Sequence, residues 1–224
     1  MQPKRFFKLG SHSGSIATTV LMCLVFVTCV VGMFVYSVSR TPVLSPEELA
    51  QRGVVLWPKP RELRPFALTT ANGEVFDGED LEGRWSFMFF GFTNCPDICP
   101  VTLSEMGQAE RALIAEQPEL AAQFQGVLIT VDPQRDTAEA LRNYVQAFSK
   151  SFVGVRGEHR ALAEFAKDVN AAFARMPSEE GPYQIDHTGT LVIINPMGHY
   201  HGFIKLPHKA DIIQQTFTSL ALSF

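Results

Sequence analysis

A buried apolar run leads the chain into a pair of cysteines, and a helical pattern begins just beyond them. Residues 85–92 are nearly all apolar, which is typical of a strand covered on both faces of a sheet. Cys95 and Cys99 follow in the loop, and the other two cysteines of the chain lie in its N-terminal apolar segment. The start of a helix favours thiolate, because free backbone N–H groups and the helix dipole stabilise negative charge. We therefore expect both sulfurs to face one shared ligand or each other.

The N-terminal segment predicts a membrane anchor. Residues 16–38 carry no charge and exceed the roughly 20 apolar residues that cross a bilayer core. Basic residues precede the run and only Arg40 follows closely, so the positive-inside bias places the N-terminus in the cytoplasm and the rest outside. A cleaved signal peptide is the alternative, but the run is long for one and lacks an A-x-A-like cleavage site. The predicted organisation is a cytoplasmic N-terminus (1–15), a single anchor in the inner (plasma) membrane (16–38), a proline-rich linker (39–64) and a periplasmic domain (65–224).

The charge balance and the cysteines limit the functions that the exported part can have. The chain has 19 Lys and Arg against 23 Asp and Glu, and this acidic balance argues against nucleic acid as a partner. Cys23 and Cys29 lie within the apolar run, where they are expected to be small apolar fillers. The exported pair can form a disulfide in an oxidising compartment. The loop that this disulfide would close is too short for it to add much to the stability of the fold. Redox or metal chemistry explains the pair better.

The remaining elements alternate between strands and helices. Asn72-Gly73 between two short apolar runs predicts an N-terminal hairpin. Further strands are expected at 126–131, 152–155, 191–194 and 200–204, and helices at 101–114, 158–173, 210–222 and from a cap at Asp136 or Thr137 to Phe148. This order predicts an α/β fold, a mixed sheet flanked by helices. A two-cysteine loop between a strand and a helix in that setting is typical of the thioredoxin-like fold.

His187 is the expected third ligand of a metal site. It lies in the loop that enters the final pair of strands, and in a thioredoxin-like sheet that loop passes beside the cysteine helix. Two thiolates leave a thiophilic metal ion under-coordinated, and imidazole complements them for copper. The sequence therefore favours a copper site of Cys95, Cys99 and His187.

Four segments of the exported domain resemble the SCO (SenC) family of copper-binding proteins that assemble cytochrome oxidase. They are residues 91–100 around the cysteines, 131–137 (Val-Asp-Pro-Gln-Arg-Asp-Thr), 152–157 with its G-x-x-G turn, and 183–187 (Tyr-Gln-Ile-Asp-His). The resemblance covers about residues 65–222. It implies a thioredoxin-like fold, copper as Cu(I) or Cu(II) held by Cys95, Cys99 and His187, and a role at the binuclear copper site of cytochrome c oxidase subunit II. Position 94, often histidine in relatives, is Asn94 here, which removes an auxiliary ligand.

Four charged residues near these motifs have two interpretations each. Asp97 either tunes the copper or caps the following helix, and the cap is favoured. Asp132 and Arg135 could have a functional role, in which they orient the loop or contact a partner. Alternatively, they form an internal ion pair that fixes their turn. Asp186 could orient the imidazole of His187, although adjacent residues of an extended chain point opposite ways.

The other histidines offer weaker sites. His199 and His201 form a His-x-His pattern on one strand face, which could hold a second metal or belong to a solvent-facing edge. His12, His159 and His208 have no partners in the sequence and are predicted to lie at the surface.

Four functions from different classes fit these residues. The first is a copper metallochaperone, whose partners would be oxidase subunit II and other copper carriers. The second is a thiol–disulfide oxidoreductase, with Cys95 and Cys99 as a redox pair that forms a disulfide and reduces the target's cysteines. A thiol peroxidase with Cys95 as the attacking thiolate is disfavoured by the close second cysteine. The fourth is a membrane-tethered sensor of copper or redox state.

Overall fold

The N-terminal apolar run forms one continuous helix, α1 (Ile16–Val38). The structure is a computed structural model that describes residues 16–38, 42–177 and 183–224. Within α1, the segment Ile16–Ser37 has a mean hydropathy of 2.5 and is long and apolar enough to cross a membrane. The chain divides into two units between Thr41 and Pro42, and α1 belongs to the first.

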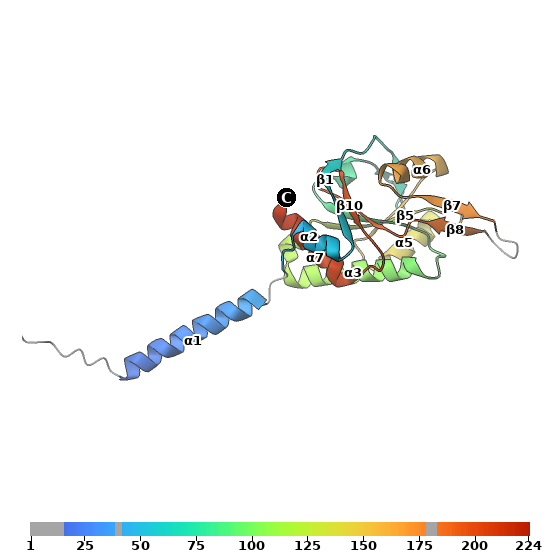
Figure 1. Ribbon diagram of the computed structural model, residues 1–224. Coiled ribbons are helices and arrows are strands. Elements are labelled where there is room, and N and C mark those ends of the chain that lie inside the picture. The colour runs from blue at the N-terminus through green and yellow to red at the C-terminus, as the bar shows by residue number, and fades with distance from the viewer. Residues whose placement is uncertain (1–15, 39–41, 178–182) are drawn as a thin grey trace, which may run out of the picture. The chain divides into compact units, whose positions relative to one another are not determined.

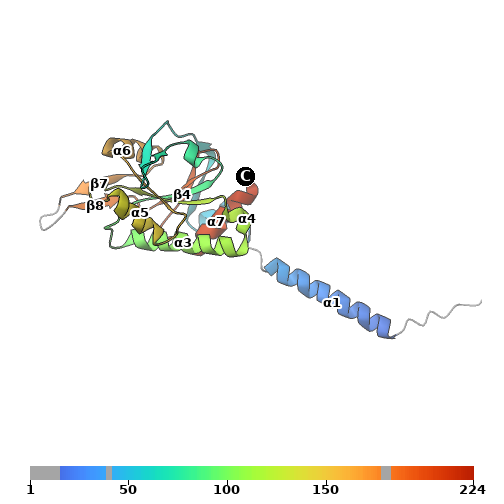
Figure 2. The same ribbon diagram turned by 180° about the vertical axis from the view of Figure 1, so that it is seen from behind.

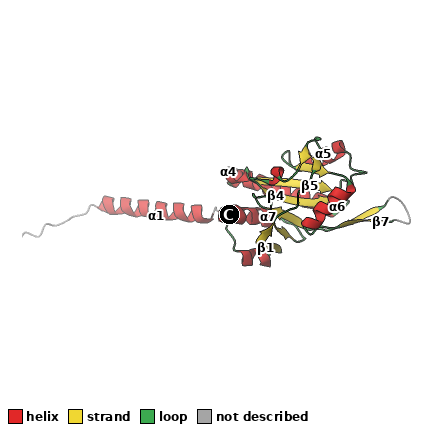
Figure 3. Cartoon of the chain, turned by 90° about the horizontal axis from the view of Figure 1, so that it is seen from above, coloured by secondary structure: helices red, strands yellow, loops and turns green. Residues whose placement is uncertain are grey.

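The second unit is built on an eight-stranded mixed sheet (Figures 1 and 3). The strand order is β1-β10-β9-β4-β5-β6-β2-β3. The strands are β1 (Val54–Arg61), β2 (Leu68–Thr70), β3 (Val75–Phe76), β4 (Trp85–Gly91), β5 (Phe124–Thr130), β6 (Val153–Arg156), β9 (Leu191–Ile194) and β10 (Tyr200–Ile204). The β4, β5 and β6 strands are parallel, whereas the pairs toward both edges are antiparallel. The predicted hairpin of β2 and β3 is confirmed, with Gly73 at a φ of 90° that favours glycine.

Helices cover both faces of this sheet, which confirms the predicted layered fold (Figures 1 and 2). They are α2 (Pro46–Gln51), α3 (Ile98–Glu116), α4 (Pro118–Ala121), α5 (Ala138–Gln146), α6 (His159–Asp168) and α7 (Ala210–Ser223), with a short 3-10 helix at Glu79–Leu81. Phe87 and Phe89 of β4 pack with α3, α5 and α7, while Met88 and Phe90 pack with α6 on the other face. All of β4 is buried, as its unbroken apolar run predicts.

The strand register brings three separate loops together at the end of the sheet where β4 and β5 finish. Gly91, the last residue of β4, lies beside Thr130, the last residue of β5. Because β9 runs antiparallel to β4, its first residue Leu191 lies beside Phe89 near the same edge. The cysteine loop, the loop after β5 and the segment that leads into β9 therefore meet there.

Two further strands form a separate ribbon, and the helix predicted over 158–173 is present but ends earlier than expected. The α6 helix ends at Asp168 because Asn170 adopts a left-handed φ of 57°, and Ala171 N–H donates to the carbonyl of Ala166. The chain then forms β7 (Phe173–Met176), which pairs antiparallel with β8 (Gln184–His187). This two-stranded ribbon projects from the body of the domain (Figures 1 and 2).

The segment expected as a linker, 39–64, contains elements of the second unit. Ser45 and Glu48 form a capping box at the start of α2, and the following β1 strand pairs with β10. Pro58 and Pro60 made this stretch resemble a linker, but an edge strand tolerates residues that lack an N–H group. The sheet therefore begins before residue 65.

Candidate metal centre

The two cysteines lie where β4 passes into α3. Cys95 is the last residue of a turn, and its N–H donates to the carbonyl of Phe92 at 3.2 Å. Cys99 lies in the first turn of α3. Both are free thiols; Cys99 is fully buried and Cys95 is half-buried. Gly91 makes room for the inner sulfur, because a Cβ at this position would lie 2.9 Å from Cys99 Sγ. The inner sulfur is thus packed against the end of the central strand.

Burial changes the expected acidity of the inner sulfur. Loss of solvation raises the pKa of the Cys99 thiol, a hydrogen bond with Cys95 raises it further, and a backbone hydrogen bond from Phe92 opposes them. The helix start was expected to favour thiolate, but at Cys99 burial outweighs that effect. In the metal-free protein, Cys99 is therefore a neutral thiol that must lose its proton to bind a metal ion.

His187 reaches the cysteines from the end of β8. Its Nε2 atom lies 3.8 Å from Cys99 Sγ, and its ring makes edge contacts with Phe89 and Phe92. Nδ1 lies 3.2 Å from the carbonyl oxygen of Thr188, which can only accept, so Nδ1 carries the proton. Burial lowers the pKa of His187, so the neutral ring presents the Nε2 lone pair to the cysteine pair.

The three side chains form a compact donor set. The two sulfurs and a ring nitrogen of His187 all lie within 4.8 Å of one another, the one such group with three or more members among the described residues. Bonds of about 2.3 Å to thiolate and about 2.0 Å to imidazole place donors roughly 4 Å apart, so small inward shifts suffice to enclose one ion. The donor types, two soft sulfurs and one imidazole, suit copper. A cleft lined by Cys95, Asp97 and His187 opens beside them.

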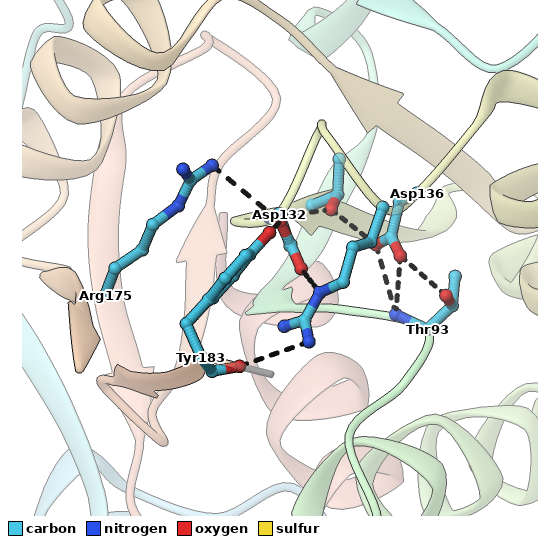
Figure 4. Close-up of polar contacts among 7 residues, drawn as sticks. Thr93, Asp132, Asp136, Arg175 and Tyr183 are labelled. Atoms are coloured by element: carbon cyan, nitrogen blue, oxygen red, sulfur yellow. Dashed lines mark hydrogen bonds and ion pairs between the residues drawn. The ribbon is translucent and has the colours of Figure 1, made fainter. Parts of the chain in front are cut away.

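Asp136 fixes the start of the cysteine loop, a role that the sequence analysis missed. Its buried carboxylate accepts from Thr93 N–H at 3.1 Å, from the Thr93 hydroxyl at 2.6 Å and from the Thr130 hydroxyl at 2.6 Å (Figure 4). The predicted cap of α5 is made by Thr137, whose hydroxyl accepts from Ala140 N–H. Asp136 thus ties the cysteine loop to the end of β5.

Asp132 forms the internal ion pair that was one of its two interpretations. It is fully buried and bonds to Arg135, while its other oxygen accepts from the Tyr183 hydroxyl at 2.7 Å (Figure 4). Arg175 lies 3.9 Å from the same carboxylate. A hydrogen bond to Asp132 raises the pKa of Tyr183, so this hydroxyl stays protonated as a donor.

The remaining acidic candidates contact the site less directly. Asp97 lies at the N-cap position of α3, but its side chain makes no capping hydrogen bond. Asp186 is exposed, and Thr188 rather than Asp186 accepts the Nδ1 proton of His187. Asp97 still lies on the wall of the cleft beside Cys95.

The other histidines have separate environments. His201 makes an edge contact with Trp85, and neither it nor His199 joins a group of three metal-ligating side chains among the described residues. The prediction that His208 lies at the surface is wrong: it is buried, with Nδ1 at 2.9 Å from the Thr102 hydroxyl. His159 is exposed as predicted, and His12 lies outside the described residues.

Comparisons with known proteins show the family of this chain. The SCO1/SenC family model matches residues 57–221. A Stutzerimonas stutzeri protein, provisionally named as copper-binding, is 39% identical over 172 residues, which cover 77% of this chain and 83% of that protein. The human protein SCO1 homolog, mitochondrial, is 38% identical over 139 residues, which cover 61% of this chain and only 45% of the human protein.

Two solved structures with copper bound share the fold. Yeast Sco1 superposes with a TM-score of 0.66 and 26% identity over 74% of this chain and 91% of that chain. Bradyrhizobium japonicum ScoI gives a TM-score of 0.62 and 27% identity over 70% of this chain and 98% of that chain.

The fold and the position of the cysteine pair define a thioredoxin-like protein with a metal- or thiol-reactive site at the end of its central strand. Within that class, the chain belongs to the SCO1/SenC family.

Proposed function

We propose that this protein is a membrane-anchored copper metallochaperone that binds Cu(I) or Cu(II) and assists assembly of the binuclear copper site of cytochrome c oxidase subunit II. The observation that carries the proposal is the convergence of Cys95, Cys99 and His187 within 4.8 Å, although His187 is 88 positions from Cys99 in the chain. Two solved structures of similar fold hold copper. The resemblance of the sequence to the SCO family further implies a role in the assembly of cytochrome oxidase. Copper is the cargo.

The donor set suits transfer between partners. Thiolates favour Cu(I), whereas an added imidazole makes Cu(II) acceptable, so the site can accept either oxidation state. Cys99 is enclosed by the sheet and α3, while Cys95 and His187 border the cleft. A partner would therefore exchange ligands first at the Cys95 and His187 side.

The anchor supports a role at a membrane. The α1 helix is long enough to span a bilayer, and the basic residues that precede it favour a cytoplasmic N-terminus with the metal domain outside. This orientation would place the domain in the periplasm, where it could meet an exported copper site of an oxidase. Fusion of a reporter enzyme that is active on only one side of the membrane to the C-terminus tests it.

Metal analysis and electronic spectroscopy of the purified chain test copper binding. We expect one copper ion per chain and strong sulfur-to-Cu(II) charge transfer, with His187→Ala losing the charge-transfer band and Cys95→Ala or Cys99→Ala losing copper. Unchanged stoichiometry and affinity in all three variants would exclude the proposal. Deletion of the gene should lower oxidase activity most strongly at low copper.

A thiol–disulfide oxidoreductase is the second candidate, because Cys99 hydrogen-bonds to Cys95 and both are free thiols. The more exposed Cys95 thiolate would attack a target disulfide and release one target thiol. Cys99 would then lose its proton and displace the second target thiol, which leaves a Cys95–Cys99 disulfide in this protein and a reduced target. Exchange with a cysteine peptide that survives His187→Ala would favour this role, and a redox-inert pair would exclude it.

A further inference from the structure

Both strands of the β7–β8 ribbon, which carries His187, contact one buried carboxylate beside the main sheet. Asp132 lies just after β5 and is fully buried. Both strands of the ribbon send a side chain to it: Arg175 from β7, and Tyr183 from the residue before β8 (Figure 4). Arg135, from the loop after β5, completes its contacts. Three cationic or hydroxyl donors thus surround one acidic group.

Tyr183 is the central member of this cluster. Its ring lies between two guanidinium groups, with Arg135 Cζ at 4.2 Å and Arg175 Cζ at 4.8 Å from the ring centroid. Arg135 also donates to the Tyr183 carbonyl at 3.2 Å. Both the side chain and the backbone of Tyr183 are therefore fixed relative to β5.

The opposite end of the ribbon has its own attachment close to His187. Thr188 N–H donates to the carbonyl of Ala172 at 2.8 Å, and the Thr188 hydroxyl accepts from Ala172 N–H at 2.9 Å. These bonds join the two strands of the ribbon to each other, not to the sheet. Phe173 and Ile185 pack partly against the core, but no residue of either strand is fully buried. The polar contacts of Arg175 and Tyr183 therefore add to a limited apolar attachment.

We propose that Tyr183, through its hydrogen bond to buried Asp132, is a positioning residue that keeps His187 within reach of the cysteine pair. The inference rests on the proposed copper site and deepens it: the imidazole ligand is placed by a contact four residues away, not by its own strand alone. Asp136 fixes the cysteine loop from the same segment after β5, so one short segment sets the spacing between the two parts of the site.

Substitution of a single hydroxyl tests this. Tyr183→Phe keeps the ring between the two arginines and removes only the bond to Asp132. In the full chain in detergent, we expect Cu(II) affinity to fall by about 10-fold, the size typical for partners that orient a ligand, with weaker sulfur-to-Cu(II) charge transfer. Cu(I) affinity, measured by competition with a chromophoric chelator, should stay unchanged because the sulfurs are held elsewhere. Tyr200→Phe is the matched control, since Tyr200 also stacks on an arginine, Arg61, but lies outside the metal centre.

A double-mutant cycle separates positioning from general stability. In the His187→Ala background, Tyr183→Phe should change Cu(II) affinity no further, because its effect acts through the imidazole. An equal loss in both backgrounds would overturn the inference in favour of a general structural role. Wild-type affinity and spectrum in Tyr183→Phe would overturn it too.

A metal-free measurement keeps this result distinct from the copper proposal. Backbone amides of β7 and β8 should exchange with deuterium faster in metal-free Tyr183→Phe than in the wild type, while amides of β4 and β5 stay unchanged. Equal exchange in the ribbon would refute the tether even if copper binds. Failure of the wild type to bind copper would instead refute the proposed function, whatever the exchange rates show.

Discussion

The cysteine side of the metal centre is part of the domain's interior, whereas its histidine side is carried by a ribbon outside the main sheet. Every residue of β4, which leads to Cys95 and Cys99, is buried, and Asp136 fixes the loop that follows. The strands β7 and β8, which carry His187, consist of exposed and half-buried residues. The two sides therefore differ in how they are held: the sulfurs form a fixed base for copper, whereas the imidazole is placed by polar contacts of the ribbon and by edge contacts with Phe89 and Phe92.

Loss of either sulfur should have the largest effect, because it removes the fixed base. We expect Cys99→Ser and Cys95→Ser to lose tight Cu(I) binding, since a hydroxyl is a poor ligand for a soft ion. Competition with a chromophoric Cu(I) chelator measures this. Retention of wild-type Cu(I) affinity by either variant would contradict the division between the two sides.

Removal of the imidazole should act mainly on the oxidised metal. His187→Ala is expected to lose the Cu(II) charge-transfer band and to weaken Cu(II) binding by more than the 10–100-fold typical for outer-shell partners. Cu(I) binding by the two thiolates should persist with a smaller loss. Equal losses of Cu(I) and Cu(II) affinity would show that the two sides act as one rigid unit.

Alanine substitutions of Gly91 and Gly189 test how the cysteine side and the histidine side of the metal centre tolerate an added methyl group. In Gly91→Ala, the new Cβ would lie 2.9 Å from Cys99 Sγ and 3.2 Å from both Leu128 and Phe89, so overpacking should cost about 1–3 kcal/mol of unfolding free energy. In Gly189→Ala, the close atom is the end of the Leu206 side chain, which can move, so a smaller loss is expected.

Chemical denaturation measures both values. Gly78→Ala is the control, because nothing lies within 4 Å of its new Cβ. A larger loss at Gly189 than at Gly91 would reverse the assignment of the rigid side.

The smallest expected effect is a dependence of stability on pH that comes from buried histidines. Burial lowers the pKa of His187, His201 and His208 below the ordinary value of 6.5. Below pH 6.5 the unfolded chain binds protons that the folded chain does not, so stability is complete above that pH and decreases as the pH falls. Denaturation between pH 7.5 and about 5 should show this slope, and His208→Gln should flatten it. An unchanged slope would mean that His208 takes up a proton as readily in the folded domain as in the unfolded chain.

Local patterns predicted the fold well where each strand or helix has one clear period. The apolar run of β4, the Asn-Gly turn of the first hairpin and the amphipathic α7 are all where the sequence places them. Prediction failed where a local signal was ambiguous. The prolines of the edge strand β1 made it resemble a linker. The end of α6 depends on the left-handed conformation of Asn170, which the hydrophobic periodicity of the sequence does not show.

The candidate site was predictable in part. Chemistry selected Cys95, Cys99 and His187, and the structure brings them together, while their role as ligands remains a prediction. The supporting contacts were not predictable, because Tyr183 and Asp132 are 51 positions apart and their bond depends on the tertiary fold. His208 was misassigned for the same reason: its partner Thr102 is 106 positions away.

The proline-containing strand β1 has a consequence for how crowded copies of the domain behave. A sheet margin with free N–H groups can recruit a strand from another molecule, but Pro58 and Pro60 supply none. The opposite margin, β3, has only two residues, too few to template a long ladder. Neighbouring copies confined to one surface would therefore resist fusing into a continuous sheet through these two strands.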